Sequence, residues 1–85
     1  MAHGVVMQSS WKPLDLPAVE VERLKRGVVV QTRYFFADSV PGSKASVVRV
    51  RKDKHGNYWV RCNYGKNLSG QSLLKWMTAD ALAHS

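Results

Sequence analysis

The sequence predicts a mainly β domain: a small antiparallel barrel of four to five strands, with an N-terminal helix and a short C-terminal helical turn. Segments rich in β-branched and aromatic residues, at 28–36, 46–52 and 57–64, are typical of strands. Turn-forming residues separate them, and every connection is short enough to join antiparallel neighbours. A chain of 85 residues suffices for one core, so we expect a flexible arm over residues 1–12 and a single domain over 13–85.

The N-terminal helix is expected from Pro17 to Arg26. Asp15 can cap its start with a carboxylate, and Pro17 suits a first helical turn. Acidic residues follow near the start and basic residues near the end, which matches the polarity of the helix dipole. Val21 and Leu24 are three residues apart, so one side of this helix would pack on the core.

The first strand is expected over residues 28–36, which read VVVQTRYFF. The aromatic residues 34–36 should lie in the core, with exposure of Phe35 at a dimer contact as the alternative. The stretch ADSVPGSKA then predicts a loop, because it combines Asp, Ser, Pro and Gly.

The polarity of the central hairpin selects its register. A loop of Lys54, His55 and Gly56, with Gly56 in the left-handed conformation, would pair Asp53 with Asn57. The pairs beyond it would be Arg51 with Trp59, Val50 with Val60, Arg49 with Arg61, and Val48 with Cys62. A shift of one residue would set valines opposite arginines, so the sequence favours this arrangement.

A fourth strand is expected at residues 71–77, QSLLKWM, with Leu74 and Trp76 pointing inward and Lys75 pointing out. Thr78 could cap a terminal turn, TADALAHS, that closes the core. On the central hairpin, the core side would carry Val48, Val50, Tyr58, Val60, Cys62 and Tyr64.

Positive charge is concentrated in the second half of the chain. Thirteen lysines and arginines against six acidic residues give a net charge of +7. Residues 1–38 contribute +1, residues 39–79 contribute +7, and Asp80 supplies the remaining −1. An asymmetry of this kind indicates an anionic partner, most often nucleic acid. The apolar runs are too short for a membrane span or a signal peptide, so we expect a cytoplasmic protein without a membrane partner.

Residues for catalysis or metal binding are not grouped in this sequence. The single cysteine, Cys62, has no second thiol and no clustered histidine, so we expect a buried structural thiol and no metal site. The sequence has no nucleophile elbow and no phosphate-cradling glycine loop. We therefore expect no catalytic residue, no cofactor and no enzymatic activity.

The outward face of the central hairpin is the candidate binding site. Its predicted members are Arg49, Arg51, Trp59, Arg61 and Asn63, with Lys52, Lys54 and Lys66 at the edges. Arg49 and Arg61 would lie directly opposite each other, and like charges in that position are destabilising unless an anion lies between them. The only acid of this segment, Asp53, belongs to the turn. We expect the face to contact the phosphate backbone of DNA or RNA, with Trp59 stacking on a base or covering an arginine.

The same sequence also fits other interpretations of this face. The face could instead be a solvated strand surface, with Trp59 shielded by a stacked Arg51. A protein-interaction module, such as a small accessory or inhibitor protein, could dock the same basic face on an acidic protein surface. An exposed edge strand would also allow a homodimer.

Four stretches carry a resemblance to a known architecture: LKRGVVVQTRY, VPGSKASVVRV, RKDKHGNYWVRCNYG and KWMTADAL. Over residues 25–83 they resemble the layout of SH3-like small β-barrels, including the KOW and Tudor-type modules. PGSKASVVRV is similar to the KOW turn and strand, although Ala45 stands where a KOW module usually has glycine. The resemblance implies an SH3-like barrel.

Two further families share parts of the pattern. The type II plasmid dihydrofolate reductases have a similar barrel and a similar end, but SLLKWMTADAL lacks their substrate-binding tetrad Val-Gln-Ile-Tyr. The DNA-reading sheet of AP2 and integrase arm-binding domains is similar to VRVRKDKHGNYWVRCNYGK. Those domains need a long helix after the sheet, and few residues remain here to form one.

Overall fold

The computed structural model describes residues 12–85, so nearly all of the arm expected over residues 1–12 lies outside the described residues. The elements, in chain order, are η1 (Val21–Arg23), β1 (Val29–Thr32), β2 (Lys44–Lys52), β3 (Tyr58–Lys66), β4 (Ser72–Thr78), η2 (Ala79–Ala81) and β5 (Leu82–His84). The mainly β class is confirmed, and the C-terminal helical turn is the single 3-10 turn η2.

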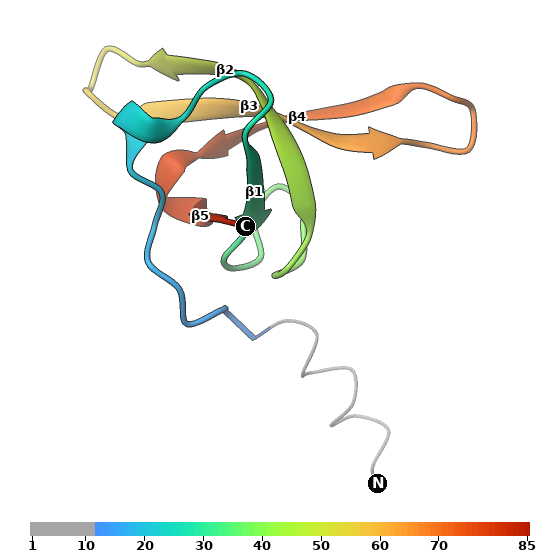
Figure 1. Cartoon of the computed structure of the whole chain (residues 1–85), viewed down its shortest axis with the longest axis horizontal. Coiled ribbons are helices and arrows are strands. Elements are labelled where there is room, and N and C mark those ends of the chain that lie inside the picture. The colour runs from blue at the N-terminus through green and yellow to red at the C-terminus, as the bar shows by residue number, and fades with distance from the viewer. Residues whose placement is uncertain (1–11) are drawn as a thin grey trace, which may run out of the picture.

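The five strands form one antiparallel sheet in the order β4-β3-β2-β1-β5 (Figure 1). Strands β1 to β4 follow the chain as a meander, and β5 returns to pair with β1 through Val30 and His84. Because η2 has three residues and joins the edge strand β4 directly to the other edge strand β5, the sheet has to curl until these two ends lie close together.

One side of the curled sheet forms the core. Val60 pairs with Met77 on β4, and both side chains are fully buried. The residues buried with them are Val19, Leu24, Val30, Ala45, Val47, Cys62, Ala81 and Leu82. Burial raises the pKa of the Cys62 thiol to about 12, which agrees with the expected structural thiol.

The α-helix expected from Pro17 to Arg26 is not formed, and a 3-10 turn at Val21–Arg23 is the helical element of this segment. Val19 donates its backbone N–H to the carbonyl of Leu82 (2.9 Å) instead of entering a helical ladder. Val19 and Leu24 are both buried. Positions five apart do not share one helix face, so a mostly extended chain covers more of the core here than a helix would.

The hairpin of β2 and β3 has the predicted register near its turn. Arg51 pairs with Trp59, Val50 with Val60, and Arg49 with Arg61. The predicted pair of Val48 with Cys62 is wrong, because a β-bulge shifts the register and sets Val47 opposite Cys62. Val47 is fixed from its other side, where it exchanges backbone hydrogen bonds of 2.8 Å with Gly27 and Val28.

The side chains of β4 point to the opposite sides of the sheet from those predicted. Met77 is the residue that enters the core, so Leu74 and Trp76 lie on the other side of the sheet. Lys75 shares the core side, where its Nζ donates to the carbonyl of Ala37 (2.9 Å) and to Oγ of Ser39 (3.0 Å). The long stem of lysine allows this, because it crosses apolar surface and carries its charge to polar partners at the rim.

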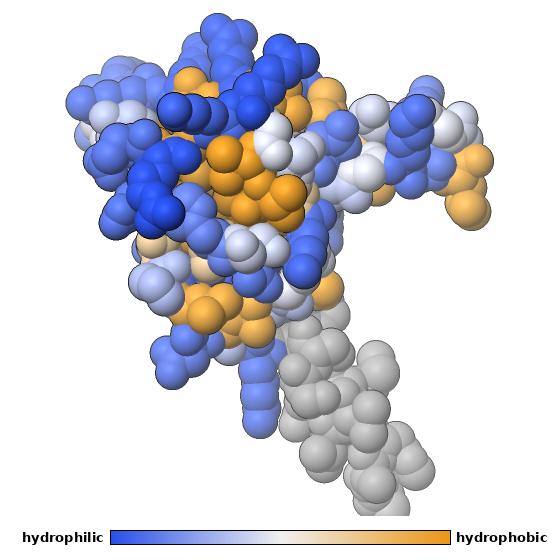
Figure 2. All heavy atoms as spheres, in the orientation of Figure 1, coloured by the Kyte–Doolittle hydropathy of each residue, from blue (hydrophilic) through white to orange (hydrophobic). Residues whose placement is uncertain are grey.

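The far end of β3 and the start of β4 extend from the body as a two-stranded arm (Figure 1). Its tip carries Leu68, which is fully exposed, and Figure 2 shows apolar atoms at this end of the molecule. Leu73 and Leu74 on the arm are also exposed. In residues 12–85, no helix has the length and apolar character needed to cross a membrane.

The turns of both hairpins are built in the same way. In the first, Oδ1 of Asp53 accepts from the backbone N–H of His55 (2.8 Å) and of Asn57 (2.9 Å). In the second, Oδ1 of Asn67 accepts from residues 69 and 71 in the same pattern. The fourth residue of each turn is a glycine with positive φ, +86° at Gly56 and +82° at Gly70. The left-handed conformation predicted for Gly56 is thus confirmed.

Replacing Gly56 with Ala should lower the free energy of unfolding by about 1–2 kcal/mol, because an L side chain is strained in this conformation. Space is not the obstacle, since a Cβ there would meet only Cε of Lys52, at 3.9 Å. Gly56→Asn is the matched control, because asparagine tolerates left-handed backbone and should lose clearly less. Urea denaturation measures both variants, and equal stabilities would contradict this account of the turn.

Candidate functional site

Two rungs of three residues each cross β2, β3 and β4 on the side of the sheet away from the core. One rung consists of Arg49, Arg61 and Trp76, and the other of Arg51, Trp59 and Thr78. Side chains on one rung point to the same face of a sheet, and positions two apart along a strand share that face. We call these six side chains the cationic face.

Among the described residues, no ion pair joins the three arginines of the cationic face to a carboxylate. Arg49 and Arg61 are direct cross-strand partners, as predicted, and Arg51 is the next outward residue on β2. Within residues 12–85, ion pairs join Arg23 to Glu20 (3.8 Å) and Arg33 to Asp80 (3.3 Å), away from this face. The repulsion between the opposed guanidinium groups of Arg49 and Arg61 is therefore not relieved by an ion pair within residues 12–85.

Asp53 directs its charge into the turn and onto an indole. Its Oδ2 accepts a hydrogen bond of 3.0 Å from Nε1 of Trp59, while Oδ1 holds the two turn amides. The bond from Trp59 is the main reason that the pKa of this carboxyl lies below its usual value, and the Asn57 and His55 amides add to the effect. The ring of Trp59 also packs against Phe36, with centroids 6.4 Å apart and planes tilted by 49°.

Trp76 is the functional candidate that the sequence interpretation missed. It is half-buried, and the guanidinium carbon of Arg61 lies 5.6 Å from its ring centroid, which is a cation–π distance. The signal in the sequence was Met77, because an unbranched apolar side chain beside a tryptophan is the better choice for the fully buried position. With Met77 inside, strand alternation places Trp76 among the arginines.

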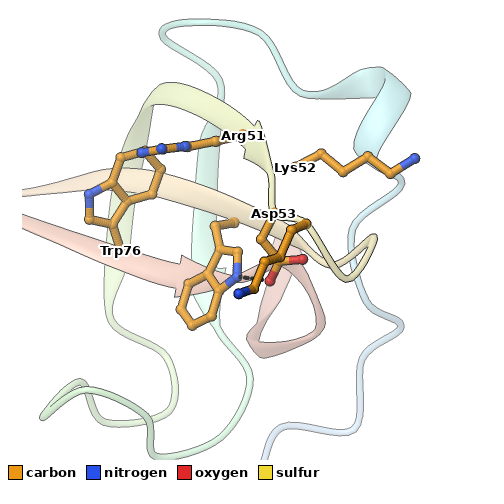
Figure 3. Close-up of a pocket in the computed structure, with 6 residues that line it drawn as sticks. Arg51, Lys52, Asp53 and Trp76 are labelled. Atoms are coloured by element: carbon orange, nitrogen blue, oxygen red, sulfur yellow. Dashed lines mark hydrogen bonds between the residues drawn. The ribbon is translucent and has the colours of Figure 1, made fainter.

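The cationic face contains an open hollow of about 420 Å³ next to the first turn. Its lining residues are Arg51, Lys52, Asp53, Lys54, Trp59 and Trp76. Figure 3 shows Arg51 directed toward Trp76, the hydrogen bond of Asp53 to an indole beside them, and Lys52 pointing away. We call this hollow the indole hollow, because the two tryptophans supply its largest apolar surfaces.

The remaining predicted site residues are spread around this centre. Lys52 lies over the ring of Tyr58, with Nζ 5.5 Å from the centroid, so its charge is on the other side of the sheet. Asn63 uses Oδ1 to accept from the N–H of Gly65 (2.9 Å), where the register of β3 with β4 shifts. Lys54 is exposed in the turn, and Lys66 is exposed at the last rung of the arm. The predicted site residues near the first turn therefore lie close together, whereas Asn63 and Lys66 lie farther along β3.

The described residues also bear on metal binding. Within residues 12–85, no three histidine, cysteine, aspartate or glutamate side chains come together as a metal site would require. The carboxylate of Asp80 is engaged in hydrogen bonds, because it accepts from Tyr34 (2.8 Å) and Arg33 (3.3 Å).

Comparisons with known proteins find no relatives for this chain. No protein-family model matches it, and no curated protein and no solved structure gives a match.

The pH dependence of stability should report on the bond between Asp53 and Trp59. The folded-state pKa of Asp53 is lowered from 3.8, so its ionised form adds stability above that value, and this stability is lost as pH falls through the lower folded pKa. Asp53→Asn can keep the turn bonds, as Asn67 does, but its neutral side chain has no such titration. Wild type should exceed this variant in free energy of unfolding at neutral pH, and the difference should shrink progressively as the pH falls below about 5. Parallel pH profiles would contradict the role given to the carboxylate.

Replacing Arg49 with Thr should raise the free energy of unfolding by roughly 0.2–1 kcal/mol at low salt, because it removes the charge opposite Arg61. The gain should shrink as added salt screens the repulsion. Arg51→Thr is the matched control, since Arg51 faces Trp59 rather than an arginine and should show no salt-dependent gain. Thermal denaturation at two salt concentrations measures the effect, and the same response from both variants would contradict the repulsion.

Proposed function

We propose that this protein binds nucleic acid, mainly through contacts of the cationic face with the phosphate backbone. The observation that carries the proposal is the direct opposition of Arg49 and Arg61, with Arg51 beside them and no ion pair to any of the three within residues 12–85. Like charges on adjacent strands lower the stability of the isolated fold, and an anion bound between them would raise it. Guanidinium groups suit phosphate, because their planar fork donates two parallel hydrogen bonds.

A nucleic acid fits this face better than an acidic protein surface does. The charges are spread over two strands rather than grouped for one contact, as a polyanion with regularly spaced phosphates requires. The tryptophans lie among these charges, and Trp76 and Trp59 offer flat apolar surfaces on which a base can stack. Docking on an acidic protein surface is the second candidate, favoured only by the net charge.

We propose binding without sequence specificity. Phosphate contacts fix the position and orientation of a protein on nucleic acid, but they carry no sequence information. Reading base edges in a groove would require a row of projecting side chains that donate and accept hydrogen bonds. The cationic face instead presents three donors of one kind, Arg49, Arg51 and Arg61, and two indole rings.

We also propose that the curled sheet is a barrel of the SH3-like layout. Three features support this: the meander from β1 to β4, the 3-10 turn η2 after β4, and the pairing of β5 with β1. In such a barrel the cationic face would lie on the outer surface of the central hairpin, which leaves it accessible to a long partner.

Titration of labelled DNA and RNA oligonucleotides should reveal binding that weakens steeply with salt. If the three arginines each neutralise one phosphate, affinity should fall roughly 20- to 40-fold between about 50 and 200 mM salt. Arg49→Gln should reduce both the affinity and the slope, whereas Arg23→Gln, already paired with Glu20, is the matched control and should change neither. Absence of binding to DNA and RNA at low salt would overturn the proposal and leave the acidic protein surface as the candidate.

A further inference from the structure

The indole hollow brings two aromatic rings to one open site. Trp59 pairs with Thr78, so Trp76, two residues earlier on β4, is its diagonal cross-strand neighbour. Such neighbours are about 7–8 Å apart, close enough for aromatic side chains to act on the same ligand. Both indoles line the hollow of about 420 Å³, so a planar group that enters it can make van der Waals contact with aromatic surface.

One wall of the hollow is held in place before any ligand arrives. The Trp59 ring is fixed at its edge by the hydrogen bond to Asp53 and along its side by Phe36. A side chain that is already immobilised loses little conformational entropy on binding. On the opposite wall, the guanidinium of Arg61 lies over the Trp76 ring.

Cationic side chains surround the hollow. Arg51 lines it from β2 and exposed Lys54 from the turn, while the charge of Lys52 lies over Tyr58. The one carboxylate in the lining, Asp53, is occupied by Trp59 and by the turn amides. A flat ring that carries an adjacent anion would thus meet indole surface and positive charge together.

We propose that the indole hollow takes one unstacked base of a single-stranded nucleic acid, with the adjacent phosphate on Arg51 and Lys54. The proposal rests on the function proposed above and adds a substrate class, single strands. In a duplex, paired bases are stacked within the helix and cannot enter a surface hollow without being extruded, at a cost in free energy. A single strand can turn a base outward and stack it on an aromatic side chain.

Trp76 is the residue to change, because Trp59 also supports the turn through Asp53. Trp76→Leu retains apolar bulk and removes the flat ring, and Trp76→Phe is the matched control that keeps an aromatic face. Arg49→Gln, outside the hollow lining, controls for lost charge. The probes are a fluorescent oligothymidine and a duplex of oligothymidine with oligoadenosine, titrated at one low salt concentration, with melting temperatures recorded for every variant.

Wild type should bind the single strand more tightly than the duplex. Trp76→Leu should lower single-strand affinity by roughly 5- to 150-fold and leave duplex affinity nearly unchanged, and Trp76→Phe should recover most of the loss. Arg49→Gln should weaken both. Equal losses on both probes in Trp76→Leu, or no loss on either, would overturn the base site while the proposed function stands. Absence of binding to either probe by wild type would overturn both.

Discussion

The hydrogen bonds of the Asp53 carboxylate set the geometry on which the site depends. Two of them close the turn at His55 and Asn57, and the third orients the indole of Trp59. Because a closed turn of this length fixes which residues face each other, it also determines that Arg49 lies opposite Arg61. The acid nearest to the arginines therefore organises their positions, and its own hydrogen-bonding capacity is largely used in doing so.

The two sides of the sheet contribute to stability in opposite directions. Valines and Met77 on the core side stabilise the sheet through burial, whereas the outward side gathers like charges on adjacent strands. Arg61 reduces this cost by lying over the ring of Trp76. The second hairpin uses the neutral Asn67 in the same turn position, so its tip has no acidic side chain in that place and carries exposed Leu68 instead.

The sequence predicted the features that depend on alternation and turn chemistry. Gly56 and the pairs from Arg51–Trp59 to Arg49–Arg61 follow from polarity matching across a short loop. The bulge could not be predicted, because Val47 and Val48 are identical and either can enter the core. Which side chains of β4 face the core was ambiguous for a similar reason, since Leu-Leu-Lys-Trp-Met has apolar residues on both faces of the strand. At residues 17–26 the charge pattern of a helix was present, but tertiary contacts of Val19 and Leu24 favoured extended chain.

The proposed function requires that an anion relieve the repulsion between the opposed arginines of the cationic face. This requirement can be tested by nuclear magnetic resonance of the arginine and indole N–H groups, recorded while a short oligothymidine is added. Signals of Arg49, Arg51, Arg61 and Trp76 should shift together, while the Trp59 indole stays bonded to Asp53. Shifts confined to other surfaces, such as η1, β5 or the tip of the arm, would contradict it.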